Sequence, residues 1–166
     1  MNSVSGISPA EARSRIVDII GESVLLASGL RDALAEERRA LERQDAEALT
    51  TVVDSKNSAA EKLQLLDRKR AELCQQWGFS DGPDQMADLI SWCDKDQRVS
   101  KQWQQLMDIA AEGSALNMTN GAIIRVRQQQ FESSLSVLRG VMPGSDTYGR
   151  NGEESGDSGR RTLAEA

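Results

Sequence analysis

The chain has 166 residues, of which 39% are hydrophobic and only 4% aromatic, and its 26 acidic and 20 basic side chains give a net charge of -6. This balance disfavours nucleic-acid binding, which depends largely on clustered lysines and arginines. The short basic run Arg68-Lys69-Arg70 lies between Asp67 and Glu72 and is typical of a solvated helix face. With no histidine and no CxxC spacing, the chain has no zinc motif, and enzymatic acid–base or nucleophilic chemistry is not expected.

No part of the sequence is predicted to enter a membrane. No stretch approaches the length of an apolar span, and the N-terminal "MNSVSGISPAE" has neither the charged region nor the apolar core of a secretory signal. We therefore expect a cytoplasmic protein without a cofactor. In that compartment the isolated Cys74 and Cys93 are expected to be buried small apolar residues, not disulfide partners.

The first half of the chain predicts two long helices. At "SPAE", Ser8 is a typical N-cap residue, Pro9 suits the first turn, and Glu11 can reach back to the cap. Interior positions then recur four and three residues apart, in a heptad pattern, at Ile16, Ile20, Ser23, Ala27, Leu30, Leu34, Glu37 and Leu41. Asp45 is a good cap for a second helix, whose stripe runs from Leu49 to Trp77. Because the connection is short, the two helices should form an antiparallel hairpin.

The segment "WGFSDGPDQ" interrupts the helical pattern. Gly78 is expected to end the second helix, and Gly82 with Pro83 to form a turn before a short helix that contains Leu89 and Trp92. The aromatic residues near this corner are expected to form a plug at one end of the hairpin: Trp77, Phe79, Trp92 and Trp103.

The helical pattern returns over residues 96–140, which predicts a third long helix. Past Met142 the chain is rich in glycine, serine and charge and has few large side chains, so residues 143–166 are expected to form a flexible tail after a helical domain of residues 1–142. The predicted fold class is all-α. It is an elongated antiparallel bundle or coiled-coil hairpin of three long helices plus one short helix, followed by that tail.

A turn-forming pair, Asn120-Gly121, lies inside the third long helix, in "LNMTNGAIIRVRQQQFESSL". Glycine inside a helix costs about 1 kcal/mol relative to alanine, so packing has to compensate. In one interpretation Gly121 permits a tight helix crossing and an asparagine fixes the register. In the other, this notch and the ridge below it bind a partner's amphipathic helix, while Arg125 and Arg127 either pair with acidic groups of that partner or are solvated. The contact residues would be Leu116, Asn117, Asn120, Gly121, Ile124, Phe131, Leu135 and Leu138.

The sequence resembles the FlgN family of flagellar export chaperones over most of its length. The most specific match is "LNMTNGAII", which is similar to the family's Asn-x-x-Asn-Gly motif, here Asn117, Asn120 and Gly121. Downstream, "YGRNG" at residues 148–152 is similar to the family's Tyr-Gly-x-x-Gly element. A wider pattern also fits the family, through Glu37, Leu41, Asp45, Leu49, Lys56, Leu63 and Arg70.

The resemblance implies a cytosolic chaperone of flagellar type III export, which binds the C-terminal amphipathic helices of the hook-filament junction proteins FlgK and FlgL. It would prevent their premature assembly and deliver them to the export gate. Tyr148, followed by Gly149, is the expected contact with the client or the gate, unless its ring folds back onto the bundle. The alternative is a structural coiled-coil protein that self-associates without a client, and a homodimer of the free protein is compatible with either function.

Overall fold

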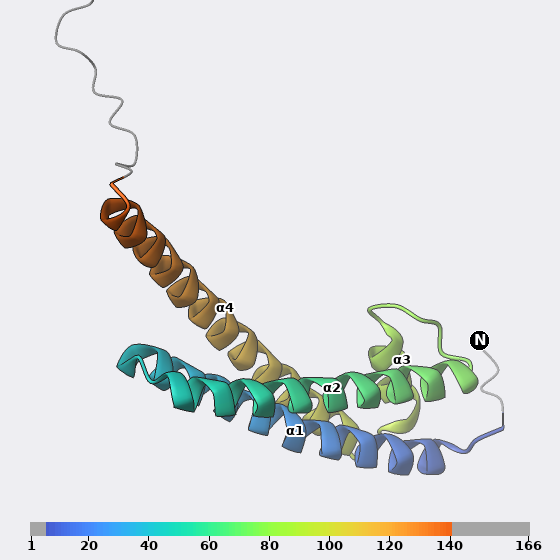
Figure 1. Ribbon diagram of the computed structural model, residues 1–166. Coiled ribbons are helices and arrows are strands. Elements are labelled where there is room, and N and C mark those ends of the chain that lie inside the picture. Colours follow the sequence, from blue (N-terminus) through green and yellow to red (C-terminus); the bar gives the residue numbers. More distant parts are fainter. Residues whose placement is uncertain (1–5, 141–166) are drawn as a thin grey trace, which may run out of the picture. The chain divides into compact units, whose positions relative to one another are not determined.

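The computed structural model describes residues 6–140, which form four α-helices (Figure 1): α1 Pro9–Arg43, α2 Ala46–Gln76, α3 Gln85–Cys93 and α4 Arg98–Leu138. This part of the chain contains no strand, so the all-α prediction is confirmed. None of its helices combines the length and the apolar character that crossing a membrane requires. The chain divides into two compact units, residues 1–128 and 129–166, and the predicted boundary at 142–143 lies outside the described residues.

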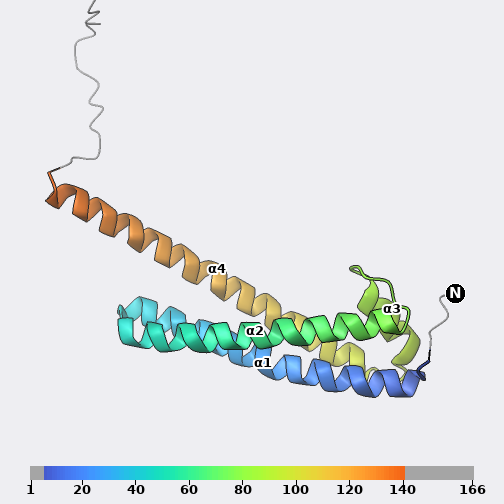
Figure 2. The ribbon, with the colours of Figure 1, turned by 45° about the vertical axis from the view of Figure 1, so that its right-hand side comes forward.

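α1 and α2 form the predicted antiparallel hairpin and lie side by side in both views (Figure 1 and Figure 2). Each begins at its expected cap, because the Ser8 hydroxyl accepts a hydrogen bond from the Glu11 N–H at 3.2 Å and the Asp45 carboxylate accepts one from the Ala48 N–H at 3.0 Å. Between the helices Gln44 adopts a left-handed conformation with a φ of 59°, which lets the chain reverse within two residues.

The two helices of the hairpin are covered to different extents. The interior positions of α1 are buried over almost the whole predicted heptad pattern, from Ile16 to Leu41, with Leu30 half-buried. In α2 only Leu66 and Cys74 are buried, while most other apolar residues of its stripe are half-buried and Val53 is exposed. The apolar stripe of α2 is therefore only partly covered by the rest of the first unit.

The main hydrophobic core lies at the corner where α3 packs against α1. The rings of Phe79 and Trp92 meet edge to face, with their centroids 5.7 Å apart. Cys74 and Cys93 are buried in the same core as free thiols, and burial raises the pKa of both, so they are the small apolar residues that the sequence predicted. The aromatic plug is also confirmed, with Trp77 and Phe79 buried and Trp92 and Trp103 partly buried against the core.

α4 begins at Arg98, and a carboxylate that sequence reasoning did not single out fixes its start. Asp94 accepts hydrogen bonds from the Val99 N–H at 3.0 Å and the Ser100 N–H at 2.8 Å. Its partial burial would raise the pKa of this carboxyl, but the hydrogen bonds outweigh burial and hold the pKa below its ordinary value. The first turn of α4 is thus capped by a residue from the end of α3.

Within the first unit α4 packs on α1 through small and apolar residues. Val99 and Ile109 are buried, and a Cβ placed on Gly113 would lie 3.7 Å from Leu34 Cδ1. At the edge of this contact Arg31 forms an ion pair with Glu112 at 3.4 Å. Both side chains are partly exposed, so the pair adds little stability, and the apolar packing holds the two helices together.

Candidate partner-binding surfaces

An apolar groove with a volume of about 540 Å³ runs over α1 between α2 and α4. All of its lining residues belong to the first unit. The groove exists because α2 and α4 do not fully cover each other's apolar side chains. Its apolar lining, which defines the groove below, includes Leu30 and Leu34 of α1, Ala60 and Leu63 of α2, and Leu106 and Ala110 of α4.

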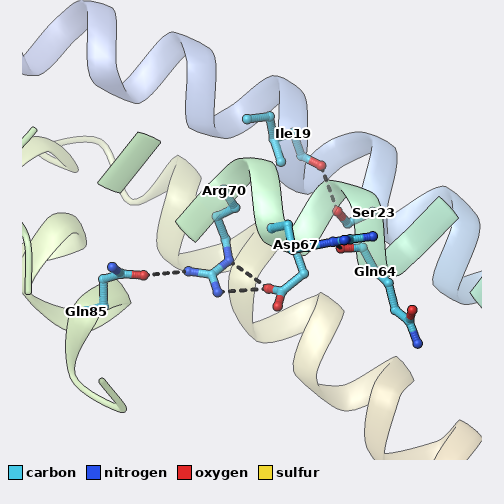
Figure 3. A network of polar contacts seen from close by, with 7 residues as sticks. Ile19, Ser23, Gln64, Asp67, Arg70 and Gln85 are labelled. Carbon is cyan, nitrogen blue, oxygen red and sulfur yellow. Dashed lines mark hydrogen bonds and ion pairs between the residues drawn. The ribbon is translucent and has the colours of Figure 1, made fainter. Parts of the chain in front are cut away.

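Arg70 closes one end of the groove. Its guanidinium donates hydrogen bonds to the Asp67 carboxylate, the shorter at 2.8 Å, and one to Gln85 Oε1 at 3.2 Å (Figure 3). The same group lies 5.3 Å from the centroid of the Trp103 ring, a distance at which the cation and the ring attract. With 14% of its side chain exposed, Arg70 links α2, α3 and α4. This basic residue therefore has a structural role.

A buried polar network lies at the opposite end. The Glu37 carboxylate, with 3% of its side chain exposed, pairs with Lys56 Nζ at 2.5 Å and accepts a hydrogen bond from Asn120 Nδ2 at 2.8 Å. Asn120 Nδ2 also donates to the Leu34 carbonyl at 2.9 Å. A buried carboxylate is costly unless it is paired and hydrogen-bonded, so this network fixes how α1, α2 and α4 align with one another.

A second hollow, of about 430 Å³, adjoins this network. It shares Lys56 and Asn117 with the groove, so the two hollows are neighbours in the first unit. Its lining, which defines the notch below, consists of Glu37, Lys56, Asn117, Met118, Asn120, Gly121, Ile124 and Arg125. The predicted residues Asn117, Asn120, Gly121 and Ile124 thus surround one hollow.

The predicted site residues of the first unit differ in their accessibility. Asn117 is exposed and Ile124 is 37% exposed, whereas Leu116 and Gly121 are half-buried and Asn120 is 1% exposed. The hydrogen bonds of Asn120 to α1 support the interpretation in which an asparagine fixes helix register.

One of the two interpretations placed a tight helix crossing at Gly121, and the structure contradicts it. A Cβ placed there would meet only Arg125 Nη1, from its own helix, at 3.8 Å. Among the described residues, no atom of another helix comes within 4 Å of that Cβ, and the notch lies beside it. The close approach is made instead at Gly113, where α4 meets Leu34.

The remaining predicted residues fall in the second unit or beyond the described chain. At the C-terminal end of α4, Phe131 is 65% exposed, Leu138 is 83% exposed and Leu135 is half-buried. These residues are four and three positions apart, so they form one apolar stripe on a helix. Tyr148 and Gly149 lie outside the described residues.

Sequence reasoning missed the groove. The signal was present in α2, where Lys56 and Arg70 interrupt an otherwise apolar stripe; these are the two residues that mark the ends of the groove. Periodicity identified the stripe, but it could not tell how much of the stripe the other helices would cover.

The described residues contain no group of three potential metal ligands among histidine, cysteine, aspartate and glutamate. The groove and the notch are lined mainly by apolar, amide and ion-paired side chains. Such surfaces are suited to holding a segment of another protein.

Comparison with known proteins is consistent with this chemistry. The model of the FlgN protein family matches residues 13–156, which include most of α1 and the whole of the other three helices. No curated protein and no solved structure matches the chain.

Proposed function

Because the chain belongs to the FlgN protein family, whose members are flagellar export chaperones, we propose that it binds the C-terminal amphipathic helices of FlgK and FlgL. It does so in the cytoplasm, where bound clients are kept unassembled until they reach the export gate. The mechanism needs no cofactor and no catalytic step, because the free energy comes from covering apolar surface on both partners.

The observation that carries this proposal is the exposed apolar stripe at the C-terminal end of α4. Phe131 and Leu138 expose 65% and 83% of their surfaces, and Leu135 lies between them on the same face. Large apolar side chains gathered in this way favour a partner that buries them. A client helix with apolar residues three and four positions apart fits such a stripe, since the side chains of two helices then interlock.

The notch, which lies in the first unit, is the second part of the proposal. Asn117 and Ile124 are accessible to a client, while Leu116 and Gly121 are half-buried beside them. Asn120 contributes indirectly, because its hydrogen bonds to Leu34 and Glu37 hold this part of α4 against α1. Tyr148 and Gly149 complete the proposal as the contact with the client or the export gate.

A second candidate is a structural coiled-coil protein that self-associates without a client. The same exposed stripe favours it, because a second copy would bury Phe131 and Leu138 equally well. The two candidates differ in their response to a client. A chaperone dimer exchanges its self-contacts for a complex with FlgK or FlgL, whereas a structural coil keeps them.

The test is calorimetric binding of purified FlgK and FlgL to the wild type, to Phe131→Asp and to Tyr148→Ala. The matched control is Gln130→Asp, which puts the same charge on the neighbouring exposed residue, outside the stripe. We expect Phe131→Asp to weaken binding at least about tenfold and the control to bind normally, since buried aromatic anchors dominate helix recognition. Circular dichroism checks that each variant folds. Wild-type affinity in both Phe131→Asp and Tyr148→Ala would show that the client binds elsewhere.

A further inference from the structure

Resting on the proposed function, we infer that the groove is a second docking site for the client, and that its occupant is an acidic amphipathic helix. The groove is distinct from the stripe at the end of α4, because all of its lining residues belong to the first unit. A client that presents two helical segments would then use both surfaces.

The shape and lining of the groove favour a helix. Leu63 and Ala60 of α2 are half-buried and Met107 of α4 is 40% exposed, so apolar surface faces the groove from both sides. A segment lying in an apolar groove must satisfy its own backbone hydrogen bonds, which a helix does internally. The small residue Ala110 on the α4 side leaves room for that helix to approach.

Charge decides the chemistry of the occupant. The charged residues that line the groove are Arg31, Lys56, Arg70 and Asp67, three cations against one carboxylate, in a chain with six more acidic than basic residues. All three cations are paired within the chain, Arg31 with Glu112, Lys56 with Glu37 and Arg70 with Asp67, so the lining holds no free positive charge. The charge that can select an apolar helix carrying carboxylates therefore lies beside the groove, in the notch.

Because every cation of the groove has an internal partner, Arg125 of the notch carries the specific prediction. Lys56 pairs with Glu37 and Arg70 with Asp67, but no ion pair to Arg125 occurs among the described residues. A Cβ placed on Gly121 would lie 3.8 Å from Arg125 Nη1, so the guanidinium lies over this glycine in the lining of the notch.

The notch adjoins the groove through Lys56 and Asn117. A carboxylate near one end of a helix seated in the groove can therefore reach Arg125, and the planar guanidinium is suited to binding it through two hydrogen bonds. The absence of a side chain on Gly121 keeps the space beside that guanidinium open for the incoming group.

The test fills the groove without disturbing the core. Ala110 is an exposed groove residue, so Ala110→Trp places a large ring in the groove. Ala111→Trp is the matched control, since Ala111 is exposed on the same helix and does not line the groove. Charge is tested by Arg125→Glu against Lys101→Glu, which reverses a charge on an exposed residue outside both hollows. Binding of purified FlgK and FlgL is measured by calorimetry at low and high salt.

We expect Ala110→Trp to weaken client binding roughly tenfold or more. Arg125→Glu should weaken client binding and also reduce the dependence of the affinity on salt. Both control variants should bind the client as the wild type does. Wild-type affinity in Ala110→Trp, with Phe131→Asp still defective, would overturn the groove site and leave the proposed function standing. Normal client binding in both Ala110→Trp and Phe131→Asp would overturn both the groove site and the proposed function. If Ala110→Trp abolishes self-association in ultracentrifugation but leaves client binding intact, the groove belongs to a second copy and the inference is wrong.

Discussion

Replacing Asn120 with alanine should destabilise the fold strongly, whereas the same replacement of Asn117 should not. The two asparagines lie less than one helical turn apart in the same motif, yet Asn120 is 1% exposed whereas Asn117 is an exposed residue of the notch. Only Asn120 forms hydrogen bonds to α1. The comparison therefore separates a structural role from a role in binding a partner.

The magnitude follows from the groups that Asn120→Ala leaves without a partner. The Glu37 carboxylate loses the donor at 2.8 Å, and a hydrogen bond to a charged group contributes about 1.5–3 kcal/mol. The Leu34 carbonyl loses the donor at 2.9 Å, which contributes about 1 kcal/mol. Their sum predicts a loss of about 2.5–4 kcal/mol in the free energy of unfolding, while Asn117→Ala should change it by less than about 0.5 kcal/mol.

The assay is urea unfolding at neutral pH, followed by tryptophan fluorescence and by far-ultraviolet circular dichroism. The two signals report the aromatic corner and the helices, so coincident transitions would justify a single free energy. A loss below about 1 kcal/mol in Asn120→Ala would refute the reasoning, because the buried carboxylate would then not depend on this donor. An equal loss in Asn117→Ala would refute it as well.

The remaining predictions concern a cap and two glycines. Asp94→Ala should cost about 1–2 kcal/mol at pH 7, since the carboxylate caps Val99 and Ser100. The pKa of Asp94 is lowered in the folded protein, so the stability that its carboxylate adds is present above the unfolded pKa. This stability is lost as the pH falls through the folded pKa. Urea unfolding should therefore show the stabilities of the wild type and Asp94→Ala converging below about pH 4. Gly121→Ala should raise the free energy of unfolding by about 0.5–1 kcal/mol, because the new Cβ meets only a flexible arginine. Gly78→Ala should lower the free energy of unfolding by about 1 kcal/mol, because the φ of Gly78 is 92°. Thermal unfolding distinguishes the two signs, and a destabilised Gly121→Ala would show that the space beside the helix is needed.

Much of the secondary structure could be predicted because its signals are local. Ser8 and Asp45 cap the helices that their neighbours form, and Gly78 lies just past the end of α2. These are properties of a few adjacent residues and do not depend on the rest of the chain. The start of α4 was harder to find, because Asp94 caps it from across an intervening loop.

The candidate site could be predicted only in part. The family motif located Asn117, Asn120 and Gly121, and the structure places all of them at one hollow. Their different roles could not be read from spacing, because Asn117 and Asn120 are the same residue type at neighbouring positions on one helix. Only the position of α1 decides that Asn120 is buried and Asn117 is not.

Helix ends and apolar periodicity are encoded within each segment, so the amino-acid sequence was enough to predict capped, amphipathic helices. How much of each apolar stripe is covered depends on how the helices pack against one another, which no single segment encodes. The other three helices bury the interior of α1, but α4 does not cover the whole apolar stripe of α2. The groove is the surface that this packing leaves uncovered.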